Sequence, residues 1–448
     1  MIVKASAATG RATICPNCFY TSYRGGVCPR CKYTATESPE NVLKPGTMLG
    51  DRYILGRLLG VGGFGVTYLA LDSVQKSVQA VKEYYPTKMA DRDPDGSMVF
   101  GGRGDKRVFD YGLTAFRREA GFLSMFRGEP SIVQASKAFD ENRTTYYAME
   151  YLDGVNLRAL TRGMNGRLPL GVAHEVLAQA STALSKIHSK GVIHRDVSPE
   201  NIYLTRDGAV KIIDFGAAEE IAKARRLGRS GAILLKPSFA PPEQYSNRGI
   251  QGPWTDIYAL AASFYYVVSG EKVPEASTRK SGTSFVPLQS LSPEVSTHLS
   301  AAISKALALD VRERYQTMDG FARDALAEKV RKENMRSILG RFSGVPYIMI
   351  ERGMSQGEKW PIPQNLDIKI GRQPGMNNVV ILDKSVSREH CLIRYDSVSG
   401  LFVAKDISTN GVFSDAGERY LRDKGIRLAP GSRFFLAKDN IMMRVGLN

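Results

Sequence analysis

The chain has 448 residues, which is more than one hydrophobic core usually serves, so about two to four domains are expected. Its apolar share of 43% and charged share of 24% are ordinary for globular proteins and exclude wholesale disorder. The net charge of +16 would suit a nucleic acid, but the basic residues are dispersed rather than gathered in one patch. We therefore expect no nucleic-acid binding and assign the charge to the binding of phosphate groups.

No segment of the chain is typical of a membrane span or a secretory signal. The longest apolar stretch, Tyr258 to Val268, is well short of the roughly 18 residues that cross a bilayer. The N-terminus, MIVKASAATGRATICPNC, lacks the apolar run of a secretory signal. We expect a cytoplasmic location.

Four of the five cysteines lie near the N-terminus as two CxxC pairs, Cys15 with Cys18 and Cys28 with Cys31. Four thiolates at such a spacing can surround a tetrahedral zinc ion. The segment resembles the short zinc ribbons of many microbial proteins, which predicts a zinc ribbon and linker over residues 1–45. One alternative is a pair of disulfides, which a cytosolic compartment disfavours. The other is a redox CxxC motif, which would need a surrounding βαβ pattern.

Between residues 53 and 70, apolar residues alternate around three glycines, Gly60, Gly62 and Gly65, which predicts two antiparallel strands. Glycines at this turn would let the backbone approach the phosphates of a nucleotide. Dinucleotide-binding folds share the glycine pattern, but there a helix follows, whereas here another strand follows. That strand, SVQAVKEYY, carries Lys82, which could pair with phosphate oxygens.

Two further motifs lie downstream, HRDVSPEN at residues 194–201 and, after another predicted strand, DFG at residues 214–216. With the glycine loop and Lys82 they resemble the motifs of bacterial eukaryotic-like serine/threonine protein kinases, in identity and in order. The resemblance covers residues 50–330. It implies a bilobal protein kinase fold that transfers the ATP γ-phosphoryl group to protein serine or threonine. The alternative is a pseudokinase scaffold that binds nucleotide and phosphothreonine partners without efficient catalysis.

The resemblance also implies a role for each side chain of these motifs. Lys82 would hold the α- and β-phosphates, and Glu119, on a predicted helix, would orient it. Asp196 would accept the proton of the substrate hydroxyl, with a surface salt bridge as the alternative role. Asn201 and Asp214 would bind Mg²⁺. The residues expected to contact ATP are Gly60, Gly62, Gly65, Val66, Ala80, Lys82 and, through hinge backbone groups, Glu150 and Leu152.

The sequence departs from the family pattern at two positions. Ser198 stands where most members have lysine, and Lys236 occupies the approximate place of a threonine. One interpretation is a weakened or dead kinase, and another is that Lys236 is an ordinary solvated side chain. We favour an exchange, in which Lys236 reaches back to the γ-phosphate and Ser198 supplies the hydroxyl. Every metal, base and phosphate-holding residue is retained, which supports this choice.

Other parts of the kinase segment are expected to be structural. A helix is predicted from Val172 to Ile187, with Gly191 as a C-cap. The resemblance pairs Glu243 with Arg314 inside the helical lobe and makes Asp256 a brace for the catalytic loop. The long segment between Lys82 and Glu119 (residues 83–115) is either a mobile loop or a docking surface.

After residue 344 the pattern changes to short strands with turn residues between them. Three motifs follow in order, at residues 370–372, 385–390 and 406–411, and they resemble a forkhead-associated (FHA) domain, a β-sandwich that binds phosphothreonine. The phosphothreonine contacts that this implies are Arg372, Ser387, Arg388, Thr409 and Asn410. His390 is expected to brace the loop, and Cys391 to be a small buried hydrophobe.

We therefore expect a multidomain α+β chain. Its parts are a zinc ribbon and linker at 1–45, a kinase domain at 50–330, a linker at 331–344 and an FHA domain at 345–448. The implied cofactors are ATP, Mg²⁺ and Zn²⁺. The implied partners are protein substrates and phosphothreonine peptides, or phosphorylated segments of the chain itself.

Overall fold

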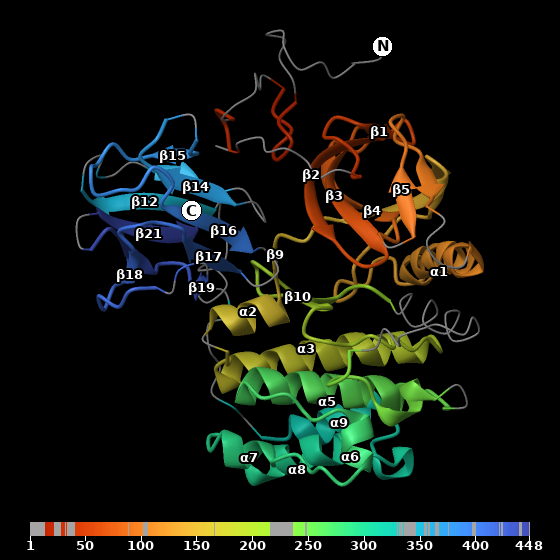
Figure 1. Ribbon diagram of the computed structural model, residues 1–448. Helices are drawn as coiled ribbons and strands as arrows, with labels where there is room; N and C mark the ends of the chain where they lie inside the picture. Colours follow the sequence, from red (N-terminus) through yellow and green to blue (C-terminus); the bar gives the residue numbers. More distant parts are fainter. Residues whose placement is uncertain are drawn as a thin grey trace. The chain divides into compact units, whose positions relative to one another are not determined.

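A computed structural model describes the chain as two compact units (Figure 1), one with Ser38–Leu157 and Gly166–Met335 and one including Arg336–Asn448. Among the described residues, no helix combines the length and the apolar character that crossing a bilayer requires. The described residues are 14–21, 28–31, 33, 41–87, 89–101, 106–164, 166–215, 236–246, 249–328, 330, 335, 346–353, 356, 359–362, 367–374, 376–396, 400–420, 422, 424–438 and 441–447. The expected linker at 331–344 lies almost wholly outside them.

The first unit opens with a six-stranded antiparallel sheet, in the order β1-β2-β3-β4-β8-β7. Its strands are β1 Met48–Leu49, β2 Tyr53–Val61, β3 Gly65–Asp72, β4 Ser77–Tyr84, β7 Phe139–Glu141 and β8 Thr144–Glu150. The strands predicted around the glycine loop and Lys82 are therefore confirmed.

Helix α1, Lys106–Ser124, packs against the face of this sheet that carries Tyr84. Its buried residues recur every three or four positions, as in a one-sided amphipathic helix. The Tyr84 ring lies 5.5 Å from the Phe109 ring and 5.8 Å from the Phe116 ring. The approach is close at Gly112, where an added Cβ would stand 2.3 Å from the Tyr84 hydroxyl. This packing fixes the helix that carries Glu119.

Part of the long segment 83–115 forms a hairpin, β5 Ala90–Arg92 with β6 Met98–Phe100, rather than a mobile loop. Arg92 donates to both carboxylate oxygens of Glu83 at 2.8 Å, and Glu83 is fully buried. Side chains alternate along β4, so Glu83 lies on the face opposite Lys82. The hairpin therefore packs on the face of the sheet opposite α1.

The first lobe begins earlier than the expected boundary at residue 50. Leu43 is buried, and its N–H donates to the hydroxyl of Tyr68 at 3.1 Å. The Gly46 N–H donates to the Leu55 carbonyl at 2.7 Å, just before strand β1. Residues 41–49 thus belong to the sheet and its packing rather than to a linker.

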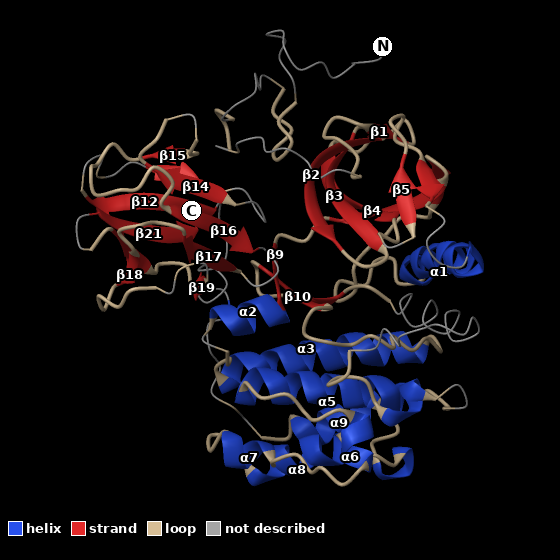
Figure 2. Ribbon diagram, viewed as in Figure 1, coloured by secondary structure: helices blue, strands red, loops and turns tan. Residues whose placement is uncertain are grey.

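The second lobe is largely helical, with helices drawn in blue in Figure 2. Helix α3 packs against α5 and α9, and α8 packs against α5 and α9. Gly191 follows α3 with φ of +70°, as expected for a residue that ends a helix. The helices are α2 Leu157–Gly163, α3 Leu170–Ser189, α5 Pro253–Ser269, α6 Ala276–Lys280, α7 Leu288–Leu291, α8 Thr297–Ala306 and α9 Met318–Ala325, with 3₁₀ turns η1 Pro242–Tyr245 and η2 Val311–Glu313.

A small sheet, β11-β10-β9, lies above these helices and positions the catalytic loop. Its strands are β9 Gly154–Asn156, β10 Ile202–Thr205 and β11 Val210–Ile212. Residues 194–201 end where β10 begins, and residue 214 follows β11 by two positions. The β10–β11 hairpin therefore brings these two motifs to the same end of the small sheet.

The C-terminal residues form a β-sandwich of two five-stranded sheets, β13-β12-β21-β20-β18 and β15-β14-β16-β17-β19. Its core draws on both sheets, from Ile348 and Phe434 of one to Ile393 and Phe402 of the other. The strands are β12 Pro346–Arg352, β13 Lys359–Pro361, β14 Ile368–Gly371, β15 Val379–Val380, β16 Cys391–Asp396, β17 Leu401–Asp406, β18 Val412–Ser414, β19 Gly425–Leu428, β20 Arg433–Leu436 and β21 Ile441–Leu447. The core uses residues of this domain alone, so the domain has what it needs to fold by itself.

Candidate active site and ligand-binding loops

Lys82 of β4 joins two carboxylates that come from distant parts of the chain. Its ammonium donates to Glu119 Oε1 of α1 at 3.0 Å and to Asp214 Oδ1 at 2.7 Å. Burial raises the pKa of Glu119 to about 7, although Lys82 opposes the rise. Burial by itself would lower the pKa of Lys82, but Asp214 and Glu119 raise it well above its ordinary value. Lys82 therefore stays charged and is held by both acids.

The catalytic loop is held from below by Asp256 of α5. One carboxylate accepts the backbone N–H groups of His194 and Arg195, both at 2.8 Å, and contacts His188 Nε2 at 2.7 Å. Arg195 has a φ of +70°, which is uncommon for a residue other than glycine. The expectation that Asp256 braces the loop is confirmed. Burial would raise the pKa of Asp256, but the bond from His188 holds it below its usual value.

Asp196 and Asn201 face each other across the same loop. Asn201 Nδ2 donates to the Asp196 backbone carbonyl and to Asp196 Oδ2, both at 2.8 Å. Burial raises the pKa of Asp196 above its ordinary value, while the charge of Lys236 opposes the rise. The Ile213 N–H donates to the Asn201 carbonyl at 3.0 Å, which ties the loop to Asp214. The last residue of that motif, Gly216, lies outside the described residues.

Lys236 reaches this loop from 40 positions further along the chain. Its ammonium donates to Ser198 Oγ at 2.7 Å and to Asp196 Oδ2 at 3.2 Å, and it lies 3.4 Å from Glu200 Oε2. Three polar partners on one loop are not the surroundings of an ordinary solvated lysine. The structure thus brings Lys236 and Ser198 into contact beside Asp196.

The backbone around Lys236 is fixed by its neighbours. The N–H groups of Phe239 and Ala240 donate to the Lys236 carbonyl at 2.8 and 2.9 Å. In the next turn, η1, Gln244 Nε2 donates to the Arg195 carbonyl at 2.7 Å. The segment that carries Lys236 is therefore bonded to the catalytic loop through the Gln244 side chain as well as through the Lys236 ammonium.

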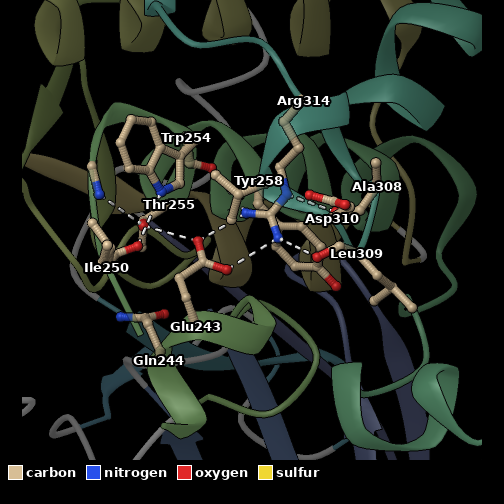
Figure 3. A network of polar contacts seen from close by, with 12 residues as sticks. Glu243, Gln244, Ile250, Trp254, Thr255, Tyr258, Ala308, Leu309, Asp310 and Arg314 are labelled. Atoms are coloured by element: carbon tan, nitrogen blue, oxygen red, sulfur yellow. Dashed lines mark hydrogen bonds and ion pairs between the residues drawn. The ribbon is translucent and has the colours of Figure 1, made fainter. Parts of the chain in front are cut away.

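The same turn is anchored in the helical lobe by Glu243, which pairs with Arg314 as expected (Figure 3). Arg314 donates to the two oxygens of Glu243 at 2.8 and 3.1 Å, and its side chain is fully buried. Its remaining donors bond the carbonyls of Trp254, Ala308 and Leu309. A buried arginine with every N–H group in use gives the turn a rigid base.

The glycine loop between β2 and β3 shows why some of its glycines are needed. An added Cβ at Gly65 would stand 2.8 Å from the Glu83 carbonyl, whereas at Gly60 and Gly63 it would meet nothing within 4 Å. The Gly62 N–H donates to the Gly65 carbonyl at 2.8 Å and closes the turn. Gly65 is thus required by packing, and the open space at Gly60 and Gly63 suits phosphates.

The strand register corrects one expected nucleotide contact. Val66 pairs with Glu83 and is fully buried, so it lies on the face opposite Lys82. Thr67 pairs with Lys82 and shares its face, as Ala80 does two positions before Lys82. On the Lys82 face, Thr67 rather than Val66 is therefore the residue expected to contact the nucleotide. The sequence could have indicated Thr67, because the last position of the family motif G-x-G-x-x-G-x-V lies two residues after the third glycine, Gly65.

The hinge between the lobes uses the Glu150 side chain as a strut. Glu150 Oε1 accepts from Lys211 Nζ at 2.6 Å and from the Gln134 N–H at 2.8 Å. The Glu150 N–H in turn donates to the Gln134 carbonyl at 2.9 Å. The side chain is thus engaged away from the adenine position, which leaves the backbone carbonyl of Glu150 and the N–H of Leu152 as the expected contacts.

Three loops of the β-sandwich meet at one edge and carry the expected phosphothreonine contacts. The Arg372 N–H donates to the Ser387 carbonyl at 2.9 Å, and the Thr409 N–H donates to Ser387 Oγ at 3.1 Å. The Arg372 and Arg388 side chains are exposed, as are Thr409 and Asn410. The Asn410 side chain adds a bond from its Nδ2 to the Ser385 carbonyl at 2.6 Å. The loops are therefore bonded to one another, while the Arg372 and Arg388 side chains remain exposed.

His390 braces these loops, as expected. Its Nδ1 accepts the Ser387 N–H at 3.0 Å, so its Nε2 carries the hydrogen that bonds the Gly411 carbonyl at 2.9 Å. Burial lowers the pKa of His390, which keeps it neutral. Cys391 is buried among the sandwich core, also as expected. No sequence motif predicts the role of Arg419, which lies outside the three motifs and donates to the Thr409 carbonyl at 3.2 Å.

The four N-terminal cysteines lie together, with their sulfur atoms all within 4.8 Å of one another. Cys15 and Cys31 are 3.7 Å apart at sulfur, as are Cys18 and Cys28, far beyond a disulfide bond of about 2.05 Å. Sulfurs around a tetrahedral zinc ion, at Zn–S of about 2.3 Å, stand about 3.8 Å apart. The arrangement therefore fits zinc and contradicts the disulfide alternative.

Comparison with known proteins gives two family matches, the protein kinase domain at residues 53–326 and the FHA domain at residues 368–437. The chain is 31% identical over 280 residues to serine/threonine-protein kinase PknB of Mycobacterium leprae, covering 60% of this chain and 42% of that protein. It is 29% identical over 238 residues to serine/threonine-protein kinase F of Synechocystis sp., covering 50% and 45%. It thus spans less than half the length of these relatives. The solved apo form of PpkA-294 matches with a TM-score of 0.58 and 32% identity, covering 64% of this chain and 100% of that one.

Proposed function

Because the chain belongs to the protein kinase family, we propose that it transfers the γ-phosphoryl group of ATP to serine or threonine hydroxyls of proteins. The observation that carries the proposal is the cluster of Lys82, Glu119 and Asp214, bonded through the Ile213 backbone to the loop of Asp196 and Asn201. Phosphoryl transfer needs aligned groups and neutralised charge more than covalent help. This cluster supplies both.

Each residue of the cluster has a task that fits its surroundings. Asp214 and Asn201 would hold Mg²⁺, because carboxylate and amide oxygens suit this ion. The Nδ2 group of Asn201 donates to Asp196, so the Oδ1 oxygen of Asn201 is the atom that would bind the cation. Bound Mg²⁺ would neutralise charge on the phosphates of ATP. Lys82 would then hold the α- and β-phosphates, with Glu119 fixing its position.

Asp196 would accept the proton of the acceptor hydroxyl. We also infer that Lys236 takes the part of the lysine missing at position 198, because its ammonium lies on Ser198 and Asp196. The charge beside the base is therefore delivered by a later segment of the chain.

A transfer assay tests the kinase assignment. The purified chain, Mg²⁺ and ³²P-labelled ATP are combined with a generic protein acceptor, and labelled residues are identified after hydrolysis. We expect phosphoserine or phosphothreonine. Asp196→Asn, which keeps the shape, should lower kcat by about 10²–10⁴-fold, as for loss of a general base. Its affinity for Mg²⁺–ADP should change less than about twofold, because the base acts on the acceptor.

Undiminished transfer by the Asp196→Asn variant would contradict the assignment of the base. Nucleotide binding without any transfer by the unaltered chain would favour the pseudokinase scaffold instead. The Lys82→Ala variant is a second control, because it should lose activity through misplaced phosphates rather than through the acceptor.

The FHA domain is proposed to read phosphothreonine on partners or on the chain itself. Exposed Arg372 and Arg388 can make charge-assisted hydrogen bonds to a phosphate, and Ser387 can add its hydroxyl. Thr409 and Asn410 would contact the peptide. A tethered phosphorylated segment can reach millimolar effective concentration, so even a weak site would fill.

The four N-terminal cysteines are proposed to bind one zinc ion as a structural site. All four ligand positions come from cysteine, which is typical of structural rather than catalytic zinc. Such a site contributes directly to folding of a segment that has little apolar core of its own.

A further inference from the structure

Strand β8 carries two neighbouring tyrosines that face opposite sides of the first-lobe sheet. Tyr146 pairs with Glu83 of β4, and Tyr147 pairs with Lys82. Because side chains alternate along a strand, the two hydroxyls enter two separate buried clusters. Each cluster contains one glutamate and one cation. The pair therefore allows the two faces to be compared with the same residue type on the same strand.

On the outer face, the cluster is complete. Tyr146 donates to Glu83 Oε1 at 2.7 Å, and Tyr68 donates to Glu83 Oε2 at 2.8 Å. Arg92 donates to both oxygens at 2.8 Å. Here a buried glutamate is held by one cation and by tyrosine hydroxyls, and both of its oxygens are satisfied.

On the inner face, the same parts are present, but one bond is not made. Glu119 Oε1 accepts from Lys82 at 3.0 Å, which accounts for one oxygen. Glu119 Oε2 and the Tyr147 hydroxyl are both buried, and within the described part of the chain neither makes a hydrogen bond of full geometry. The Tyr147 side chain is nevertheless near enough to Glu119 to lower the pKa of that carboxyl, against the larger rise that burial causes. A phenol is a donor and a carboxylate oxygen an acceptor, so each of these two atoms can satisfy the other.

The two side chains are close enough to influence each other. The Lys82 ammonium lies 5.7 Å from the ring centroid of Tyr147 and 5.7 Å from that of Phe116, within the range of a cation–π contact. Burial, and next the negative charge of Glu119, raise the pKa of Tyr147 well above its ordinary value. Tyr147 thus lies in the field of both members of the Lys82–Glu119 pair.

We propose that the Tyr147 hydroxyl donates a hydrogen bond to Glu119 Oε2 in the nucleotide-bound protein, which makes Tyr147 a positioning residue for the Lys82–Glu119 pair. This inference rests on the proposed kinase function. In the structure, Lys82 divides its ammonium between Glu119 and Asp214. When Asp214 binds a cation, Glu119 is the remaining carboxylate partner of Lys82. A second hydrogen bond, at Oε2, then fixes the rotamer of Glu119.

The test is a pair of matched variants in the full chain, Tyr147→Phe and Tyr146→Phe. Both remove one buried hydroxyl from the same strand and keep the ring. Initial rates give kcat and KM for ATP, and calorimetry gives the affinity for Mg²⁺–ADP. Tyr147→Phe should lower kcat/KM for ATP, and weaken ADP binding, by about tenfold, the usual size for a lost hydrogen bond to a charged group. Tyr146→Phe should change both by less than about twofold.

A double-mutant cycle with Glu119→Gln separates this role from packing. With the charge at Glu119 removed, Tyr147→Phe should have little further effect, because the bond depends on the carboxylate. Loss of the same factor in both backgrounds, or unchanged ADP binding in Tyr147→Phe, overturns the proposal. Melting temperatures check that both variants fold. If Tyr147→Phe does not fold, Tyr147→Leu, which also removes the hydroxyl, replaces it. ADP binding needs no phosphoryl transfer, so this result stands even if the wild-type chain fails the transfer assay.

Discussion

The proposed kinase site and the proposed phosphothreonine site arrange their positive charges in opposite ways. In the kinase cluster, Lys82 and Lys236 each contact two carboxylates of the protein itself. In the β-sandwich loops, Arg372 and Arg388 are exposed, and among the described residues the Arg372 guanidinium bonds a backbone carbonyl, that of Val386 at 3.2 Å, rather than a carboxylate. One site balances its charge internally, and the other leaves its charge for a ligand.

This difference follows from what each site must do. A site for transfer must keep its groups in place before and after the reaction, so internal pairing preorganises it. A reader must gain its binding energy from the phosphate, and a guanidinium already paired with a carboxylate would have to give up that partner first. The cysteine module resembles the reader in this respect, because its four sulfur atoms gather where a cation could bind them.

Substitution of Lys236 tests the internal charge pairing of the kinase site and has the largest expected effect. Lys236→Thr should lower kcat by about 10²–10³-fold, as for loss of one preorganised donor at developing charge. Adding Ser198→Lys should recover at least about tenfold, because the double variant moves the ammonium to the adjacent position on the same loop. Steady-state transfer rates measure both. Lys186→Ala is the control, since Lys186 pairs only with Glu129 in the described structure.

No recovery in the Ser198→Lys, Lys236→Thr double variant would count against the exchange. It would show that the ammonium must come from the later segment. Full activity of Lys236→Thr alone would remove Lys236 from the mechanism altogether.

The reader side is tested by Arg372→Ala. Loss of one charge-assisted contact should weaken binding of a phosphothreonine peptide by about 10–100-fold, measured by fluorescence anisotropy. Transfer to a generic substrate should stay unchanged. Arg394→Ala is the matched control, because Arg394 is an exposed arginine of β16 that forms a surface ion pair with Asp367 at 3.9 Å. Equal binding of phosphorylated and unphosphorylated peptides by the unaltered chain would end the reader hypothesis.

The sequence predicted the parts of these sites that are carried by motifs. Lys82, Asp196, Asn201 and Asp214 were identified because phosphoryl chemistry restricts the residue type at each position. Arg372 is predicted by the resemblance of its motif to the FHA domain, in which charged donors bind phosphate. The domain order followed from the change in apolar periodicity after residue 344.

What the sequence missed depends on three-dimensional pairing. Choosing Val66 instead of Thr67 was a one-residue error, and a one-residue shift moves a side chain to the other face of a sheet. The packing of the β5–β6 hairpin depends on the contact of Arg92 with Glu83, which no local sequence pattern predicts. Tyr147 belongs to no motif, and its place beside Glu119 follows only from the β4–β8 register.

Zinc removal tests the cysteine module as a second site that awaits a ligand. Purified under reducing, chelator-free conditions, the chain should release about one zinc per molecule to a strong chelator, measured by atomic emission. Cys28→Ser should lose most of this zinc, and Cys391→Ala should keep it, because Cys391 lies in the sandwich core. Transfer activity should change less than about twofold. Absence of zinc from the unaltered protein contradicts the site.

The smallest expected effect is on the pH dependence of unfolding and comes from His390. This residue extends the comparison of the two sites, because it holds the reader's loops as a neutral group. It is the only one of the five histidines after residue 345, so the isolated residues 345–448 report on it alone near neutral pH. Burial lowers its pKa in the folded state, whereas the unfolded value is about 6.5. The stabilising contribution is therefore complete above about pH 6.5 and is lost as the pH falls toward the folded pKa. Protonation removes the acceptor that Nδ1 offers to the Ser387 N–H, which explains the direction. Urea unfolding between pH 7.5 and 5 should show the free energy of unfolding falling by at most about 1.4 kcal/mol per pH unit. A free energy of unfolding that stays level over this range would mean that His390 does not hold the loops as a neutral imidazole.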